Sequence, residues 1–212
     1  MPDDPVRATI FVADDDEAVL DSLRLLLDGH GYAVAGFASG EALLEALDAP
    51  DAAPDCAVVD VRLPGLSGLE LQQRLLQRNR DLPVIIITGH GDIDMAVRAL
   101  KAGAFDFIEK PFDDGRLLDG LADALAGATR RKAATETVST TAASYAELSE
   151  RQRQVMDLVA EGAANKEIAA RLGISPRTVE IYRAKVMEKM GARNLAELVR
   201  MALALEKNGP QR

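Results

Sequence analysis

Residues 8–37 read ATIFVADDDEAVLDSLRLLLDGHGYAVAGF, and this stretch decides the fold of the chain. Its first part, residues 8–13, is a short apolar run that favours a buried strand. Residues 17–28 carry apolar side chains at helical spacing and are followed by glycines, as is typical of a helix end. A second apolar run at residues 33–37 predicts another strand. A strand, a helix and a strand in this order predict one β–α–β unit.

The same alternation continues to residue 126. Ser67 and Glu70 fit a capping box at the start of one of the later helices. The remaining strands are expected at residues 56–59, 84–88 and 105–109, and the remaining helices at residues 40–49, 68–79, 92–102 and 113–126. Strands joined by short helical connections predict a parallel sheet that is covered by helices on both faces.

Polar side chains stand where four of these strands end. They are Asp14, Asp15 and Asp16 after the first strand, Asp60 at the end of the third, Thr88 as the last residue of the fourth, and Glu109 as the last residue of the fifth, followed by Lys110. We expect them to converge, because the carboxyl ends of parallel strands meet at one edge of the sheet. Carboxylates packed together repel unless a cation intervenes, and oxygen ligands favour a hard cation such as Mg²⁺. With that metal, an aspartate can act as a nucleophile toward a phosphoryl group, which Thr88 and Lys110 would then contact.

The charge divides the chain into an acidic and a basic part. Residues 1–128 hold 10 Lys and Arg against 24 Asp and Glu, whereas residues 129–212 hold 15 against 10. An acidic and a basic half indicate two separate functions, and the basic half is expected to bind an anionic partner. Between them, residues 127–147 are rich in Ala, Thr and Ser, which is typical of a helix tail followed by a flexible connector.

Composition excludes several classes of protein. No apolar run approaches the roughly 20 residues of a membrane helix, and the acidic N-terminal stretch does not read as a secretory leader. One cysteine, Cys56, and two histidines exclude an internal disulfide and a structural zinc site. We therefore expect a soluble, cytoplasmic protein with no membrane partner.

From Ser149 onward the pattern is entirely helical. Asn165 is predicted to cap a short helix, and a tight turn at residues 173–175 leads from it to the next helix. The expected helices are bounded by residues 149 and 162, 165 and 172, 176 and 190, and 195 and 206. Two helices about one tight turn that contains glycine match the DNA-binding helix-turn-helix.

The helix over residues 176–190 has two different sides. Its inward side is expected to carry Val179, Tyr182, Val186 and Met190, and its outer side and flanks Arg177, Glu180, Ile181, Arg183, Ala184, Lys185 and Glu188. An exposed mixture of basic and small apolar groups suits a DNA major groove. Lys166, Arg177 and Lys189 are expected to contact phosphates, and Glu180 to accept a hydrogen bond from a cytosine amine. Without further context, a merely solvated helix face is the alternative.

Four blocks of the acidic half together resemble the receiver domain of two-component response regulators. They are VADDDE at residues 12–17, VVDVRLPGLSG at 58–68, ITGHGD at 87–92 and FDFIEKPF at 105–112. The resemblance spans residues 8–126 and implies a flavodoxin-like, five-stranded, doubly wound fold. It also implies a cis peptide bond between Lys110 and Pro111.

The resemblance assigns a role to each site residue. Asp60 is the implied phospho-acceptor, and Thr88, Lys110 and Phe107 are the implied phosphate-sensing and switch residues. The implied cofactor is Mg²⁺ or Mn²⁺, held by Asp14, Asp15, Asp60 and the backbone carbonyl of Arg62. We expect Asp16 to cap the following helix instead.

The basic half resembles a second family over residues 148–192, LSERQRQVMDLVAEGAANKEIAARLGISPRTVEIYRAKVMEKMGA. This segment is similar to the LuxR-type helix-turn-helix of NarL/FixJ regulators, and to the FixJ branch in particular. The resemblance implies a recognition helix over residues 176–190. The side chains nearest the DNA are then Thr178, Glu180, Ile181, Arg183, Ala184 and Lys185. The predicted organisation is a receiver at residues 1–126, a linker at 127–147 and an all-α, four-helix DNA-binding domain at 148–212.

Together the resemblances imply a transcription regulator rather than a metabolic enzyme. A sensor histidine kinase would phosphorylate Asp60, and the phosphorylated chain would form a homodimer on double-stranded DNA. The implied dimer surface includes Arg98, Lys101 and Arg116, and RNA polymerase is a further implied partner. The only chemistry expected is self-phosphorylation and self-dephosphorylation.

Two other functions stay open at this point. An aspartyl-phosphate phosphatase would use Asp14 as nucleophile together with Asp16, although it would leave Asp60 and the basic half unexplained. A DNA-binding regulator whose first domain senses a small ligand would work without phosphorylation.

Overall fold

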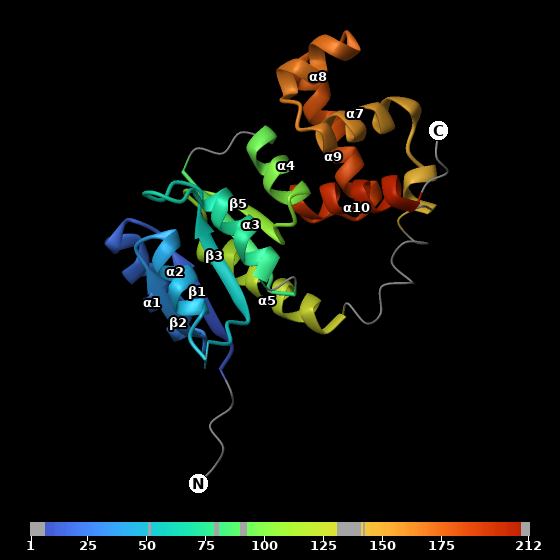
Figure 1. Ribbon diagram of the computed structural model, residues 1–212. Coiled ribbons are helices and arrows are strands. Elements are labelled where there is room, and N and C mark those ends of the chain that lie inside the picture. The colour runs from blue at the N-terminus through green and yellow to red at the C-terminus, as the bar shows by residue number, and fades with distance from the viewer. Residues whose placement is uncertain are drawn as a thin grey trace. The chain divides into compact units, whose positions relative to one another are not determined.

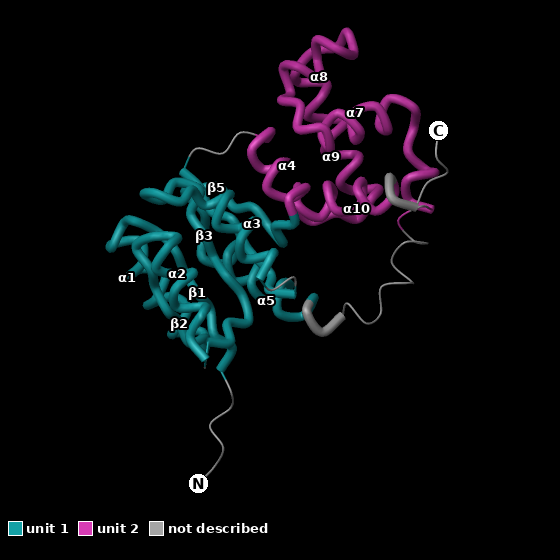
Figure 2. Tube along the Cα trace, in the orientation of Figure 1, with its two compact units in different colours: residues 1–90, 103–129 teal, residues 91–102, 130–212 magenta. Residues whose placement is uncertain are grey.

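The computed structural model describes residues 7–50, 52–78, 81–89, 93–130, 141 and 143–208. The chain falls into two compact units, residues 1–90 with 103–129 and residues 91–102 with 130–212 (Figures 1 and 2). Each unit has a hydrophobic core of its own.

The first unit is built on a parallel sheet of five strands, in the order β2-β1-β3-β4-β5 (Figure 1). The strands are β1 (Thr9–Ala13), β2 (Ala33–Phe37), β3 (Cys56–Asp60), β4 (Val84–Thr88) and β5 (Asp106–Glu109). All five predicted strands are confirmed to within one residue at each end. β1 pairs with β2 on one side and with β3 on the other, so the strand order reverses between β1 and β3. In such sheets, ligands bind beside the carboxyl ends of the strands at this reversal.

Helices pack on this sheet through leucine-rich faces. α1 (Glu17–Gly29) and α5 (Asp114–Arg130) both contribute side chains to one core cluster with the strands. α2 (Gly40–Leu47) and α3 (Gly68–Arg78) contact each other and strands β1 to β3. The predicted capping box is confirmed, because the Ser67 N–H donates to the Glu70 carboxylate at 3.1 Å and the Glu70 N–H donates to Ser67 Oγ at 3.4 Å.

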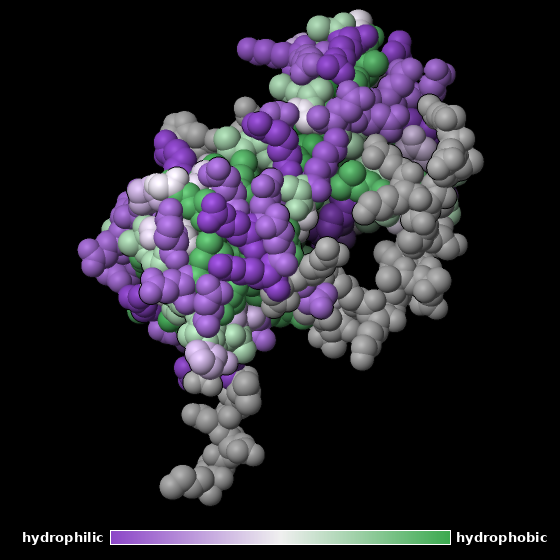
Figure 3. All heavy atoms as spheres, viewed as in Figure 1, coloured by the Kyte–Doolittle hydropathy of each residue, from purple (hydrophilic) through white to green (hydrophobic). Residues whose placement is uncertain are grey.

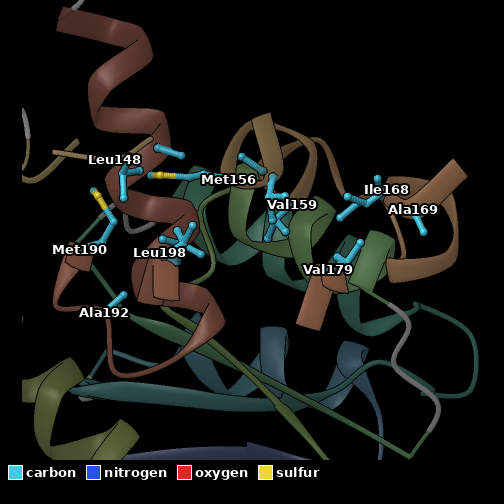
Figure 4. Close-up of a cluster of buried hydrophobic side chains, with 14 residues drawn as sticks. Leu148, Met156, Val159, Ile168, Ala169, Val179, Met190, Ala192 and Leu198 are labelled. Carbon is cyan, nitrogen blue, oxygen red and sulfur yellow. The ribbon is translucent and has the colours of Figure 1, made fainter. Parts of the chain in front are cut away.

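The second unit is helical. It contains α4 (Ile93–Lys101), α7 (Glu150–Glu161), α8 (Asn165–Leu172), α9 (Pro176–Met190) and α10 (Leu195–Asn208). α4 contacts α7 and α10. Figure 4 shows part of the core, in which Ile168 of α8 lies near Val179 of α9, and both side chains are fully buried.

The ends of these helices follow the sequence with one exception. The capping box of Ser149 and Gln152 is present, and α7 and α8 end at glycines with positive φ, Gly162 at 97° and Gly173 at 65°. The prediction that Asn165 caps α8 is wrong, since Ala164 is the N-cap and its side chain makes no capping hydrogen bond. Asn165 lies inside the helix, and its side-chain oxygen accepts a hydrogen bond from another helix instead.

The predicted domain limits at residues 1–126, 127–147 and 148–212 stay a prediction. α5 runs through Arg130, so a helix tail covers the start of the predicted linker. Residues 131–140 and 142 of that linker lie outside the described residues.

Two further observations concern the surface. None of the described helices is long and apolar enough to span a lipid bilayer. On the face shown in Figure 3 the described surface is largely hydrophilic. Among the described residues, the large hydrophobic side chains that stay exposed are Leu25, at 79%, and Ile181, at 49%.

Candidate functional site

An acidic pocket opens at the carboxyl ends of the strands in the first unit. Asp14 directly follows β1 and Asp60 ends β3, so these two carboxylates flank the reversal of strand order. Lys110 directly follows β5. The residues that line the pocket are Asp14, Asp15, Asp16, Val19, Asp60, Arg62, Gly89 and Lys110. The structure thus brings together the expected aspartates and Lys110, whereas Thr88 and Glu109, expected at the same edge, are not among the lining residues. Val19 and Gly89 line the pocket without having been expected.

Lys110 joins the two central carboxylates. Its Nζ donates to Asp14 Oδ2 and to Asp60 Oδ2, each at 2.6 Å. The Asp14 side chain is 1% exposed, that of Asp60 9% and that of Lys110 22%. The ammonium is thus a largely buried bridge between carboxylates that would otherwise repel.

Burial and pairing shift the pKa values at this bridge. Loss of solvent raises the pKa of Asp14 above its ordinary value of 3.8, although the hydrogen bond from Lys110 works in the opposite direction. Desolvation works to lower the pKa of Lys110, but its bonds to Asp14 and Asp60 outweigh it and raise that pKa above 10.5. One ammonium thus serves two carboxylates. Four aspartates line the pocket against Lys110 and Arg62, so acidic side chains outnumber basic ones there.

The backbone holds Asp60 in place. Its Oδ1 accepts a hydrogen bond of 2.9 Å from the Arg62 N–H, and the Gly68 N–H donates to the Val61 carbonyl at 2.9 Å. A Cβ added to Gly68 would lie only 2.0 Å from the Asp60 carbonyl oxygen. Glycine is therefore needed at position 68 so that the start of α3 can approach Asp60. The helical pattern of residues 68–79 predicts Gly68 only as a helix start.

The other predicted receiver residues are placed as follows. Thr88 ends β4 and is 1% exposed, and the Lys110 N–H donates to its carbonyl at 2.7 Å. The half-buried Phe107 lies on β5. Asp16 caps α1 as predicted, because its Oδ1 accepts a hydrogen bond from the Ala18 N–H at 2.9 Å. The peptide bond between Lys110 and Pro111 is cis, as the resemblance implied.

The basic residues expected on a dimer surface have carboxylate partners in two cases. Arg116 pairs with the buried Asp106 at 2.8 Å, and Arg98 pairs with Asp94 at 3.0 Å. Lys101 ends α4 and is exposed. Arg98 and Lys101 belong to the second unit and Arg116 to the first, so their use in a common surface stays a prediction.

A second candidate site lies on α8 and α9 of the helical unit. Val179, Val186 and Met190 are buried and Tyr182 packs against the same core, which confirms the predicted inward side of α9. The predicted DNA-facing residues that are exposed are Lys166, Arg177, Glu180, Ile181, Ala184, Lys185 and Lys189. Thr178 and Arg183 are half-buried.

Several of these side chains have partners within the unit. The Arg177 guanidinium donates to the Glu180 carboxylate at 2.7 Å, and the Thr178 hydroxyl lies 2.8 Å from the hydroxyl of Ser175, the N-cap of α9. Lys189 Nζ donates to the Glu147 carbonyl at 2.9 Å. Arg183 Nη1 donates to Asn165 Oδ1 at 2.8 Å, a contact between α9 and α8 that no pattern in the sequence predicts.

Both halves match known protein families. Residues 10–122 match the response regulator receiver domain, and residues 146–202 match the bacterial regulatory proteins of the luxR family.

Individual relatives align over nearly the whole chain. The transcriptional regulatory protein FixJ of Bradyrhizobium diazoefficiens is 47% identical over 197 residues, which is 93% of this chain and 95% of that protein. The C4-dicarboxylate transport transcriptional regulatory protein DctR of Rhodobacter capsulatus is 45% identical, over 91% of this chain and 98% of that protein.

Solved structures agree with these alignments. The crystal structure of full-length FixJ from B. japonicum matches this chain with a TM-score of 0.53 and 45% identity. The match covers 94% of this chain and 98% of the FixJ chain. The structure of FixJ-N matches with a TM-score of 0.51 and 43% identity. This match covers 56% of this chain and 94% of the FixJ-N chain. The chain therefore belongs to the transcriptional response regulators that combine a receiver domain with a LuxR-type helix-turn-helix DNA-binding domain.

Proposed function

We propose that this response regulator accepts a phosphoryl group on Asp60 from a sensor histidine kinase, and that this event controls dimerisation and DNA binding. The observation that carries the proposal is the placement of Asp14 and Asp60, each 2.6 Å from Lys110 Nζ in one pocket at the sheet edge. The same proposal places the protein in the cytoplasm, with double-stranded DNA and RNA polymerase as its partners.

The chemistry follows from the groups in the pocket. A carboxylate oxygen of Asp60 attacks phosphorus, the bond from phosphorus to the donor histidine nitrogen breaks, and an acyl phosphate forms. Lys110 already faces Asp60, so its ammonium is available to pair with the new phosphate. The hydroxyl of Thr88, at the end of the neighbouring strand, is proposed to donate to the same group.

The residues of the pocket fit the divalent cation that this reaction uses. Among the described residues, no three His, Cys, Asp or Glu side chains form a close metal-ligating group. Mg²⁺ does not require one, since it binds through one or two carboxylates and retains water molecules. The candidate ligands are Asp14, Asp15, Asp60 and the Arg62 carbonyl, of which one or two carboxylates would bind the ion directly while it keeps its water molecules. The ion would supply charge neutralisation for the transferring phosphoryl group.

Label mapping tests the proposal directly. The protein is treated with acetyl phosphate and Mg²⁺, and peptide mass spectrometry locates the added phosphoryl group. We expect the label on Asp60. Label on Asp14 would favour the phosphatase alternative instead.

A second experiment tests the output. DNA selection from random duplexes, with and without phosphorylation, is expected to yield a two-fold symmetric site that is enriched more strongly by the phosphorylated protein. Equal DNA binding of the wild type and of the Asp60→Asn and Lys110→Ala variants, under phosphorylating conditions, would support the ligand-sensing alternative.

Gly68→Ala is expected to impair phosphorylation without touching any side chain of the pocket. The new methyl group would meet the Asp60 carbonyl at 2.0 Å and force the backbone to move. Displacement of a reacting group by about 1 Å costs roughly 100-fold in rate, so we expect a loss of that order in the initial rate of acetyl phosphate uptake. Gly29→Ala is the matched control, because a Cβ there has no atom within 4 Å. Unchanged uptake by Gly68→Ala would contradict the backbone argument.

Ile181 is expected to read thymine methyl groups. It is 49% exposed on α9, and apolar side chains on a recognition helix contact the C5-methyl of thymine. Ile181→Ala should weaken binding to the selected duplex by about 1 kcal/mol, roughly fivefold. Replacing the thymines of that duplex with uracil should weaken wild-type binding similarly and leave the variant unaffected, as measured by fluorescence anisotropy. If the wild type and Ile181→Ala lost the same affinity on the uracil duplex, the predicted contact of Ile181 with thymine methyl groups would be wrong.

A further inference from the structure

Arg183 differs from the other basic residues on the outer side of α9. The Arg177 side chain is 82% exposed, and Lys185 is exposed as well. Arg183 is half-buried, and its Nη1 donates to Asn165 Oδ1 at 2.8 Å. Its guanidinium is therefore directed to a group of the same unit.

The bond joins the start of α8, which is its end away from the connecting turn, to the middle of α9. The turn after Gly173 joins the end of α8 to the start of α9. Asn165 is the first residue of α8, and Arg183 lies midway along α9. Between these two connections, the fully buried Ile168 and Val179 pack in the core (Figure 4). A turn at one end, an apolar contact in between and a hydrogen bond at the other end together determine the angle between the two helices.

The electrostatics indicate why Arg183 needs this acceptor. Burial lowers the pKa of Arg183, which means that desolvation disfavours its charge. The start of a helix carries partial positive charge, which also disfavours a nearby cation. The N-cap of α8, Ala164, has no side-chain oxygen to cap this end, and the Asn165 oxygen accepts from the guanidinium there. The amide thus compensates part of the cost of placing a cation at this point.

We propose that Arg183 is a positioning residue, which fixes the recognition helix α9 against α8 through Asn165, and not a residue that contacts DNA. The proposal rests on the DNA-binding function of this helix-turn-helix. It places Asn165 in the same role, because the oxygen of one side chain and the guanidinium of the other form a single connection.

The test compares Arg183→Met, Asn165→Ala and the double variant in the full chain. Binding is measured by anisotropy on the duplex selected by the wild type and on a scrambled duplex, over a range of salt concentrations. We expect each single variant to lower the ratio of specific to non-specific affinity by about tenfold, the effect of one hydrogen bond to a charged group. The double variant should lose no more than either single one, and the salt dependence should match the wild type.

Lys166→Met is the matched control, since Lys166 is the exposed neighbour of Asn165 and a predicted phosphate contact. Loss of one phosphate contact makes the negative slope of log affinity against log salt less steep by about 0.9, and it weakens binding to both duplexes alike. If Arg183→Met behaved in this way while Asn165→Ala kept full affinity, Arg183 would contact DNA and the proposal would be overturned. Fully additive losses in the double variant would overturn it too.

Folding is kept separate from positioning. Circular dichroism reports the folded fraction, and titration with excess DNA reports the fraction competent to bind. Neither fraction alters the ratio of the affinities for the two duplexes. If Arg183→Met did not fold, Asn165→Ala would decide the question alone, because it leaves the arginine charge in place. Failure of the wild type to bind any duplex would count against the proposed function and not against this assignment.

Discussion

Replacing Asp60 with asparagine is expected to reduce phosphoryl uptake to background. The amide has nearly the shape of the carboxylate and keeps an oxygen for the Arg62 N–H, which now lies 2.9 Å from Oδ1. It lacks the charged oxygen that attacks phosphorus, so the nucleophile is lost while the fold is retained. The measurement is incorporation of radiolabel from acetyl phosphate in the presence of Mg²⁺.

Asp16→Asn is the matched control for this variant. Asp16 lines the same pocket, but its carboxylate caps α1 through the Ala18 N–H. Asparagine caps a helix as well as aspartate does, so uptake and stability should stay close to those of the wild type. Label that persists in Asp60→Asn and maps to Asp14 would overturn the assignment of the acceptor.

Replacing Lys110 with methionine is expected to destabilise the folded protein by about 3 kcal/mol at neutral pH, the cost of removing one partner from a buried ion pair. Asp14 and Asp60 both lose the ammonium that lies 2.6 Å away, and neither is exposed enough for water to replace it fully. Urea unfolding followed by circular dichroism measures the change. Lys101→Met removes an exposed lysine at the end of α4 and should have little effect.

The pH dependence of this loss has a definite sign. The pKa of Asp14 is already raised by burial, and loss of Lys110 removes the interaction that lowers it. A carboxyl group whose folded pKa exceeds its unfolded value favours folding when protonated. The deficit of Lys110→Met should therefore be small below pH 3.8, the ordinary value, and grow as the pH rises through the folded pKa of Asp14.

Mg²⁺ should reduce the same deficit. An ion bound by the folded pocket stabilises it by mass action and supplies the missing positive charge. We expect a larger rise in stability with Mg²⁺ for Lys110→Met than for the wild type. A variant as stable as the wild type at neutral pH, and indifferent to Mg²⁺, would show that Lys110 does not balance the two carboxylates.

Much of the fold could be read from local patterns. A strand such as β4 (Val84–Thr88) is a continuous apolar run because both of its faces are buried, and its limits matched those expected. The N-terminal ends of α7 and α9 also follow from local sequence, because serine is a common N-cap. Ser149 and Ser175 accept hydrogen bonds from the first turns of these two helices. Such signals lie within a few residues of each other, so the sequence alone displays them.

Asn165 shows where a prediction from neighbouring residues alone fails. Asparagine is a common N-cap, and the prediction relied on that preference. In the structure its oxygen accepts a hydrogen bond from Arg183, 18 residues away, and Ala164 takes the cap position without a side-chain bond. Gly68 is similar, because its need for a missing Cβ arises from the carbonyl of Asp60 in a neighbouring element.

The sequence by itself determined the order of strands and helices, the gathering of carboxylates at one sheet edge and the inward side of α9. Each of these follows from hydrophobic periodicity and from the direction of parallel strands, which are properties of short segments. Only the tertiary structure decided which polar groups became partners. Lys110 meets carboxylates 50 and 96 residues away, and Arg183 meets an amide on another helix. A long charged side chain pairs with whatever acceptor the packed backbone brings within about 3 Å, and no local pattern encodes that neighbour.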